Sequence, residues 1–252
     1  MHKNIPIDHP RYISLTIREK LVNGFKAGIV VPQGLMAHGR GEAFDYLLGE
    51  NTTPSALYAE KAACCLLLIS KHPVISVNGN TAALCSREIV ELSKLLGASL
   101  EVNLFHQSQR RSHLIAETLI ENGATQVFGL YSATRTMING ISSNRRFVDT
   151  FGMAKADTVF LALEDGDRCQ ALRSQGKNVI SVDLNPLSRT AQASSITIVD
   201  NLIRAVPNMV NLTNQLRAEK VSELIKIVSE FDNETNLKYS TEVIRNGIQK
   251  RY

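Results

Sequence analysis

The stretch HPVISVNGNTAALCSREIVELSKLLGASLEVNLF, residues 72–105, decides the fold class of this chain. A short apolar run rich in β-branched residues (74–78) is followed by a helical pattern (83–98) and then by a second apolar run (100–105). A strand, a helix and a strand at this spacing indicate two parallel strands joined by a crossover helix. Strands of this kind belong to a sheet whose two faces are both covered.

Further apolar runs of the same kind follow along the chain, and helical stretches separate several of them. The runs are TQVFGL (125–130), TVFLAL (158–163), NVISVDL (178–184) and ITIVDN (196–201). We therefore predict a doubly wound α/β fold with a mainly parallel sheet, in which ligands bind at the carboxyl ends of the strands.

Helical patterns precede and follow these strands. They cover residues 11–28, 42–50 and 54–73 at one end, and 201–231 and 241–252 at the other. Because no repeat or low-complexity linker interrupts the chain, we expect one α/β domain over residues 1–252, with helical segments at about 1–73 and about 201–252. Residues 131–157 show the least pattern, which is typical of a functional loop.

The charge and the apolar content narrow the classes of partner. The 28 Lys and Arg against 24 Asp and Glu give a net charge of +4, which is too mild to favour a nucleic acid or a membrane surface. The N-terminus lacks the apolar stretch of a signal peptide, and no run approaches the ~20 apolar residues of a membrane span. The four cysteines lack C-x-x-C spacing. We expect a cytoplasmic protein that binds a small molecule.

Polar residues stand where predicted strands end. Asn78 and Asn80 separate a strand from a helix, and the free N–H groups at a helix start favour an anion. An Asn-Gly turn with an Asn cap explains the same residues equally well.

The stretch VDLNPLSRTA (182–191) follows another predicted strand. Asp183 and Asn185 are suited to a ribose or a base, and Arg189 and Thr190 to a phosphate group. A capped turn is the alternative, because Asn, Pro and Ser are ordinary turn residues.

Two more polar clusters follow strands. Asp200 and Asn201 repeat the pattern before another helix. In LEDGDR, the carboxylates of Glu164, Asp165 and Asp167 suit Mg²⁺ together with phosphate oxygens. We favour the other explanation, in which these carboxylates mark the N-terminus of a helix.

The tetrad His38-Gly39-Arg40-Gly41 places a permanent cation between two residues without side chains. Glycine lets the backbone approach a ligand closely and adopt a positive φ, and arginine offers fixed donors that match phosphate oxygens. The tetrad therefore suggests an oxyanion clamp, with a solvated surface turn as the alternative.

Several motifs are missing from the sequence. The chain has no G-x-G-x-x-G and no G-x-x-x-x-G-K-[ST], nothing resembles a nucleophile elbow, and no two histidines have the spacing of metal ligands. A nicotinamide oxidoreductase is therefore disfavoured, whereas a nucleotide-binding regulator without catalysis stays open.

A resemblance to a known family adds to these observations. PQGLMAHGRGEAFDYLLGE, HPVISVNGNTAAL, LEVNLF, LEDGDR, VDLNPLSRTA and ITIVDNLIRAVPNM closely resemble, in this order, the archaeal phosphopantothenate synthetases, also called 4-phosphopantoate–β-alanine ligases. The resemblance implies Rossmann-like homodimers that use Mg²⁺. It also implies that ATP, 4-phosphopantoate and β-alanine give 4'-phosphopantothenate, AMP and diphosphate in coenzyme A biosynthesis.

The resemblance also implies site residues. The expected contacts to ATP are Arg18, Arg40, Asp183, Leu184, Asn185, Arg189, Thr190, Asn201 and Leu202. The expected contacts to phosphopantoate are His38, Asn78 and Asn80, together with Arg135 and Arg145 as phosphate binders. His38 is also a candidate base for the β-alanine ammonium group, because the ordinary pKa of histidine is close to neutral pH. No metal ligands are implied.

Overall fold

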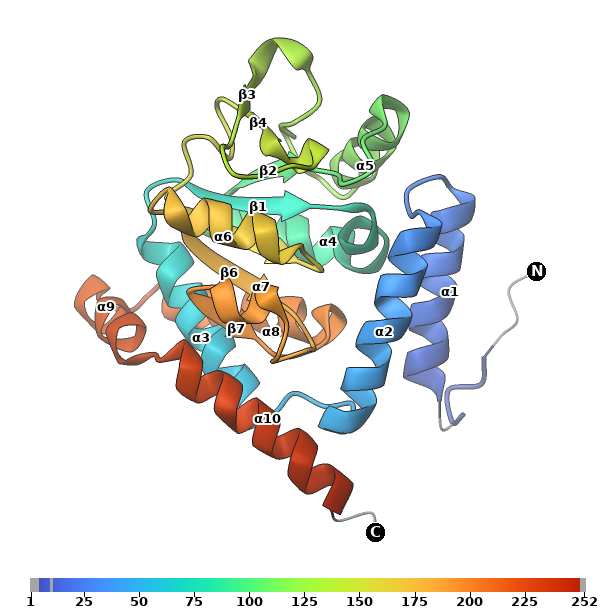
Figure 1. Ribbon diagram of the computed structural model, residues 1–252, viewed down its shortest axis with the longest axis vertical. Coiled ribbons are helices and arrows are strands. Elements are labelled where there is room, and N and C mark those ends of the chain that lie inside the picture. The colour runs from blue at the N-terminus through green and yellow to red at the C-terminus, as the bar shows by residue number, and fades with distance from the viewer. Residues whose placement is uncertain (1–4, 10, 250–252) are drawn as a thin grey trace.

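The computed structural model describes residues 5–9 and 11–249 and contains a five-stranded parallel sheet (Figure 1). The order of its strands is β2-β1-β5-β6-β7. The strands are β1 (Pro73–Val77), β2 (Ser99–Val102), β5 (Thr158–Ala162), β6 (Asn178–Val182) and β7 (Ile196–Ile198). The parallel pairing of β1 with β2 confirms the crossover that the sequence predicts.

Helices cover both faces of the sheet. Neighbouring residues of one strand, such as Val159 and Phe160, are buried in two different apolar clusters because successive side chains point to opposite faces. One face packs against α6 (Gly166–Ser174), and the other against α3 (Pro54–Ile69), α4 (Gly79–Leu96) and α8 (Leu202–Leu216). Both strand residues are fully buried, as expected in a sheet covered on both sides. The predicted doubly wound α/β fold is confirmed.

The remaining helices surround this core. They are α1 (Tyr12–Lys26), α2 (Pro32–Leu48), α5 (Gln109–Glu121), α7 (Arg189–Ala193), α9 (Val221–Glu230) and α10 (Asn233–Gln249). Figure 1 shows α1 and α2 side by side, with α2 standing at the edge of the sheet toward which β1 points. Within the described part of the chain, every helix falls short of the length and apolar character that a membrane span requires.

Several predicted elements differ from the observed ones. The run 125–130 is not a strand of the sheet, and it contributes only an isolated bridge between Phe128 and Glu101. Gly129 interrupts the extended backbone with a φ of +85°, a value that favours glycine. The helical pattern 201–231 is divided between α8 and α9. The loop 131–157 contains a hairpin of β3 (Arg135–Met137) and β4 (Phe147–Asp149).

Three other predicted helices have different bounds. The helix expected at 241–252 is part of α10, which begins at Asn233, and positions 250–252 lie outside the described residues. The helix expected at 42–50 is part of the longer α2, which starts with Pro32 at its first position, where the missing N–H costs no hydrogen bond. The helix expected at 54–73 ends at Ile69, because Ser70 already has an extended backbone.

Glu60 of α3 is a fully buried carboxyl group in this core. Burial, together with the nearby charge of Asp200, raises the pKa of Glu60 to about 8. Between about pH 4.5 and about pH 8, the folded chain therefore keeps a proton that the unfolded chain releases.

We expect the free energy of unfolding to fall as the pH rises through this interval, by roughly 2–5 kcal/mol at about 1.4 kcal/mol for each pKa unit. Glu60→Gln should remove the contribution of this group and leave the smaller one of Glu101, a second buried carboxyl group whose pKa burial raises to about 7. Glu91→Gln, a change at an exposed position of α4, should leave the whole dependence intact. Urea unfolding at several pH values measures both. A decline of equal size in Glu60→Gln would assign the effect to other groups.

Candidate active site at the carboxyl ends of the strands

The strand order places a topological switch point between β1 and β5. From β1 the chain continues to β2 on one side, and it returns to β5 on the other side. In open α/β sheets, ligands bind outside the carboxyl ends of the strands at such a point. Two clefts adjoin there, and they share lining residues from α2 and from the ends of β2 and β5. The shared residues are Ala37, Phe105, Leu163 and Asp165.

The larger cleft has a volume of about 760 Å³ and lies between α2 and the turns that follow β5 and β6. It brings together most of the residues that the resemblance assigns to ATP. These are Arg40, Asp183, Leu184, Asn185, Arg189 and Thr190.

Asp183 is the single carboxylate among these six residues, and it is partly buried. It accepts hydrogen bonds from the Ser188 hydroxyl and from the backbone N–H of Asn185 (2.9 Å). Burial raises the pKa of Asp183, although these two hydrogen bonds and the nearby charge of Arg40 oppose the shift. The turn after β6 is thereby held in one conformation at the edge of the cleft.

The smaller cleft has a volume of about 340 Å³ and contains the N-terminus of α4. Asn78, Asn80 and Arg145, which the sequence predicts as substrate contacts, line this cleft. Arg111 and His106 line it as well. The cleft therefore combines two largely buried guanidinium groups with a helix N-terminus, an arrangement that favours an anion.

Asn78 links the two strands at the switch point. Its side-chain oxygen accepts the backbone N–H of Thr81 (3.0 Å), and its amide donates to the carbonyl of Ala162 (2.7 Å). The capping role considered for this residue is confirmed. Asn80 lies two residues further and donates to the carbonyl of Gly34 in α2 (2.8 Å). This hydrogen bond connects α2 to the start of α4.

The tetrad His38–Gly41 is not a loop, because all four residues lie inside α2. Neither Gly39 nor Gly41 has a positive φ, so the predicted glycine clamp is wrong in its conformation. A helix accepts glycine at a cost of about 1 kcal/mol. Arg40 is nevertheless exposed and lines the larger cleft.

We expect Gly39→Ala to raise the free energy of unfolding by about 0.5–1 kcal/mol and to leave the steady-state kinetics unchanged. A Cβ atom at Gly39 would meet nothing within 4 Å. At Gly79, the matched control, a Cβ atom would lie 2.3 Å from the carbonyl oxygen of Ile29, and alanine should destabilise the fold. Chemical denaturation measures both changes. A loss of stability in Gly39→Ala would mean that position 39 needs glycine after all.

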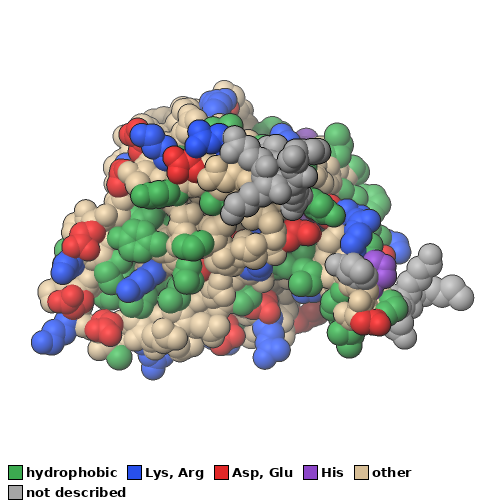
Figure 2. All heavy atoms as spheres, turned by 90° about the horizontal axis from the view of Figure 1, so that it is seen from below, with side chains coloured by type: hydrophobic (Ala, Val, Ile, Leu, Met, Phe, Trp, Pro, Cys, Tyr) green, Lys and Arg blue, Asp and Glu red, His purple; other side chains and the backbone are tan. Residues whose placement is uncertain are grey.

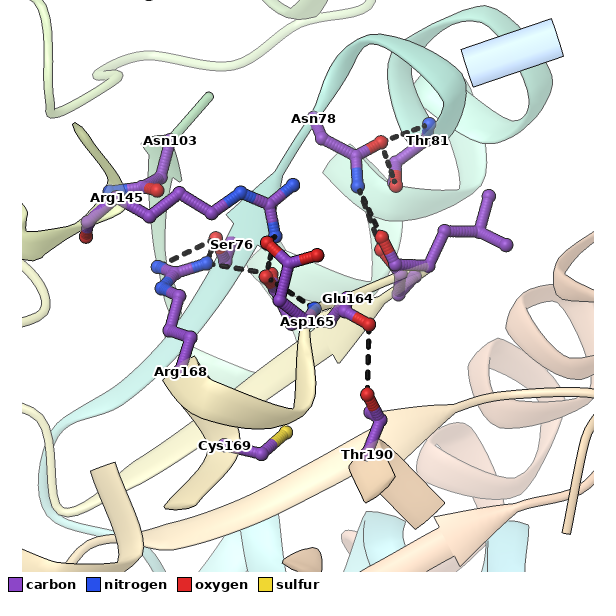
Figure 3. A network of polar contacts seen from close by, with 12 residues as sticks. Ser76, Asn78, Thr81, Asn103, Arg145, Glu164, Asp165, Arg168, Cys169 and Thr190 are labelled. Carbon is purple, nitrogen blue, oxygen red and sulfur yellow. Dashed lines mark hydrogen bonds and ion pairs between the residues drawn. The ribbon is translucent and has the colours of Figure 1, made fainter. Parts of the chain in front are cut away.

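Glu164 occupies the turn between β5 and α6, where its carboxylate is buried between two arginines (Figure 3). It forms ion pairs with Arg145 and with Arg168 (2.7 Å). The expectation that the carboxylates of LEDGDR mark a helix N-terminus is confirmed in position, because α6 begins at Gly166 with Asp165 at its N-cap. The charge of Glu164, however, is matched by guanidinium groups and not by the helix alone. Asp167 does lie in the first turn of α6, and it forms an exposed ion pair with Arg189.

Both arginines of this network keep their charge at neutral pH. Burial lowers the pKa of Arg145 and of Arg168 to about 10, which is still well above neutrality. Two carboxylates face these two guanidinium groups, because Asp165 also lies 3.5 Å from Arg145.

Other predicted residues lie outside the two clefts. Arg18 projects from α1 and forms an ion pair with Glu42 of α2 (2.8 Å). Arg135 lies on the hairpin, where it donates to the carbonyl of Gly129 (3.5 Å) and contacts the side-chain amide of Gln107. The structure therefore does not bring these two arginines to the clefts.

His38, Asn201 and Leu202 line a small cavity of about 20 Å³ that adjoins the larger cleft. Leu163 and Leu184 belong to both. Burial lowers the pKa of His38, and its Nε2 atom is buried without a hydrogen-bond partner in the described part of the chain. Neutral imidazole is the form that accepts a proton.

Sequence reasoning missed Arg111, His106 and Phe105 as residues of the clefts. The available signal for Phe105 and His106 is their position at the end of the run 100–105, at the same edge of the sheet as Asn78.

The fold and the clefts define a doubly wound α/β protein with a candidate site at the topological switch point, where arginines and a helix N-terminus line the clefts.

Comparison with known proteins identifies the family within this class. Residues 55–247 match the family described as phosphopantothenate/pantothenate synthetase. A 4-phosphopantoate–β-alanine ligase of Methanosarcina mazei is 48% identical over 246 residues, which cover 98% of this chain and 96% of that protein. A 4-phosphopantoate–β-alanine ligase of Thermococcus kodakarensis is 50% identical over 231 residues, which cover 91% of this chain and 88% of that protein. The chain belongs to the phosphopantothenate/pantothenate synthetase family.

Proposed function

We propose that this protein is an ATP-dependent carbon–nitrogen ligase of coenzyme A biosynthesis. It joins 4-phosphopantoate to β-alanine and forms 4'-phosphopantothenate, AMP and diphosphate. The observation that carries this proposal is the match along nearly the whole chain to relatives named 4-phosphopantoate–β-alanine ligase. The two adjoining clefts support it, because the reaction needs a nucleotide and a phosphorylated acid side by side.

ATP is assigned to the larger cleft. Asp183 and Asn185 provide acceptors and donors for the ribose or the base, and the exposed guanidinium group of Arg40 is available to phosphate oxygens. Arg189 would exchange its exposed ion pair with Asp167 for a phosphate group. Asn201 and Leu202 adjoin this cleft through the small cavity. The contact of Arg18 to ATP stays a prediction from the family resemblance, because the Arg18 side chain pairs with Glu42 in this structure.

4-Phosphopantoate is assigned to the smaller cleft. Its phosphate group meets the N-terminus of α4, Arg111 and Arg145, where a doubly charged anion is most stable. Its carboxylate then faces the residues that both clefts share, Leu163 among them. This orientation directs the carboxylate toward the nucleotide.

The chemistry proceeds in two steps. The pantoate carboxylate attacks the α-phosphorus of ATP, the bond to the β-phosphate breaks, and diphosphate leaves. The amine of β-alanine then attacks the acyl carbon, and AMP leaves with the electron pair of the acyl–oxygen bond. Negative charge grows on phosphate oxygens in both steps, so Arg40 and Arg189 stabilise the transition states electrostatically.

The ammonium group of β-alanine must lose a proton before it attacks. His38 is the candidate base, because its buried Nε2 atom has no partner among the described residues and its lowered pKa keeps it neutral. A phosphate group of a substrate is the alternative acceptor.

Mg²⁺ is proposed to enter the site with ATP. The described residues contain no group of three or more His, Cys, Asp or Glu side chains that could hold a metal ion, but Asp165 and Asp167 line the larger cleft. This donor set fits Mg²⁺, which usually takes one or two carboxylates together with substrate phosphates. When bound, the ion would neutralise charge on the phosphate oxygens.

A homodimer is also proposed. Figure 2 shows hydrophobic side chains among charged ones on the face that includes α9 and α10. Leu57 and Tyr58 of α3, Ile225 of α9 and Tyr239 of α10 are large apolar or aromatic residues with exposed side chains. Exposed apolar patches often mark interfaces. Light scattering at assay concentration should give twice the mass of 27.8 kDa, and a monomer would contradict the proposal.

A diphosphate-release assay tests the function. Sustained release over many turnovers should require ATP, 4-phosphopantoate and β-alanine together, whereas one equivalent per site can form without β-alanine because diphosphate leaves in the first step. ¹⁸O from a labelled pantoate carboxylate should appear in AMP. Sustained release without dependence on all three substrates would overturn the proposed reaction, and unlabelled AMP would overturn the acyl adenylate. Nucleotide binding without any release would favour a regulator.

A further inference from the structure

We infer that Glu164 is a positioning residue, which holds the guanidinium group of Arg145 in place for the phosphate of the acid substrate. This inference rests on the proposed function, because it assigns 4-phosphopantoate to the smaller cleft. Glu164 itself lines the larger cleft, so it acts on the smaller cleft through Arg145.

The carboxylate of Glu164 joins the two arginines through separate oxygens. Oε1 pairs with Arg145, and Oε2 pairs with Nη1 of Arg168 (2.7 Å). The side chain of Glu164 is 3% exposed, and that of Arg145 is 7% exposed. In Figure 3 both guanidinium groups point toward this carboxylate. Ion pairs with this degree of burial hold a fixed geometry because water does not compete for them.

Arg168 anchors the carboxylate from the opposite side. Its guanidinium group donates to the hydroxyl of Ser76 on β1 at 3.2 and 3.3 Å, and its side chain is 1% exposed. Arg168 is thus fixed by the sheet. Its contribution to the site is to orient Glu164, which in turn orients Arg145.

Hydrogen bonds from two other elements hold the backbone of the turn that contains Glu164. The amide of Asn78 donates to the carbonyl of Ala162, and the hydroxyl of Thr190 donates to the carbonyl of Glu164 (2.8 Å). Leu163 between them has a φ of +53°, a strained value for a residue with a branched side chain. A strained backbone of this kind persists where surrounding contacts hold it in place, which is common at functional sites.

Arg145 lines the ligand space and keeps a hydrogen-bond donor that is not used within the described residues. It lines the smaller cleft, and its buried Nε atom has no hydrogen-bond partner among the described residues. Without the carboxylate of Glu164, the side chain would lose the one ion pair that fixes it at close range, since its other carboxylate, Asp165, lies at 3.5 Å. A misplaced guanidinium group binds phosphate less well.

The test compares two variants with the wild type. Glu164→Gln removes the carboxylate charge. The double variant Glu164→Gln/Arg168→Met also removes one guanidinium charge, so it restores the net charge of the buried network. Calorimetry measures the affinity of each protein for 4-phosphopantoate, for pantoate without the phosphate, and for ATP, and thermal melts measure stability.

We expect Glu164→Gln to weaken the binding of 4-phosphopantoate by about tenfold or more, with little change for pantoate or ATP. The double variant should regain stability but not this affinity. Two results would overturn the inference: equal losses of affinity for 4-phosphopantoate and pantoate, or full recovery of affinity in the double variant. Glu164 would then serve only to neutralise the charge of the buried arginines. A wild type that does not bind 4-phosphopantoate would overturn the proposed function itself, and the inference with it.

Discussion

Replacing Arg40 with alanine should lower kcat by roughly ten- to a hundredfold or more, because a charge-assisted hydrogen bond contributes about 1.5–3 kcal/mol and about 1.4 kcal/mol changes a rate tenfold. The effect falls on kcat if the contact tightens in the transition state. The melting temperature should not change, because the structure records no hydrogen bond or ion pair from Arg40 to another described residue, and its side chain is exposed beside the cleft.

Arg40→Lys should recover only part of the activity, because an ammonium group lacks the planar fork that binds two phosphate oxygens. Arg87→Ala is the matched control, since Arg87 is an exposed arginine of α4 outside both clefts. Steady-state kinetics and thermal melts on the three variants separate the outcomes. Full activity in Arg40→Ala would show that Arg40 is a solvated surface residue.

Replacing Arg145 with methionine should raise KM for 4-phosphopantoate by about a hundredfold or more, because two charge-assisted hydrogen bonds of about 1.5–3 kcal/mol each are lost. KM for ATP should change little, since Arg145 lines only the smaller cleft. The enzyme should also lose its preference for 4-phosphopantoate over pantoate. The fold should persist, because Glu164 keeps its ion pair with Arg168.

Arg135 provides the control for this prediction. It lies ten positions before Arg145 but on the hairpin outside the clefts, and Arg135→Ala should leave KM for 4-phosphopantoate near the wild-type value. Kinetics with both acids measure this. An unchanged KM in Arg145→Met, or an equal increase in Arg135→Ala, would contradict the assignment of the phosphate to the smaller cleft.

Much of the fold follows from the sequence because parallel strands have a strong local signature. The strands that flank the switch point are buried on both faces, so β1 and β5 appear as continuous β-branched and apolar runs. The run 125–130 has the same composition, but Gly129 and a single bridge at Phe128 keep it out of the sheet. Neither the clamp nor the surface turn considered for the tetrad around Arg40 is correct in conformation, because local glycines do not reveal that the surrounding residues continue a helix.

The sequence predicts a site residue correctly where the order of strands and helices alone determines the position of that residue. Asn78 and Asp183 end parallel strands, so the sheet brings them to one edge. The burial of Glu164 depends on arginines that approach from the hairpin and from α6, and no local pattern indicates such pairing. For the same reason, the ion pair of Arg18 with Glu42 was not foreseen.

The structure of the protein in complex with ATP tests the account most directly. We expect the nucleotide in the larger cleft, with its phosphate groups at Arg40 and Arg189 and its ribose or base at Asp183 and Asn185. A nucleotide bound in the separate cavity of about 420 Å³ between α1 and α2, which Tyr12 and Glu42 line, with the larger cleft left free, would contradict it.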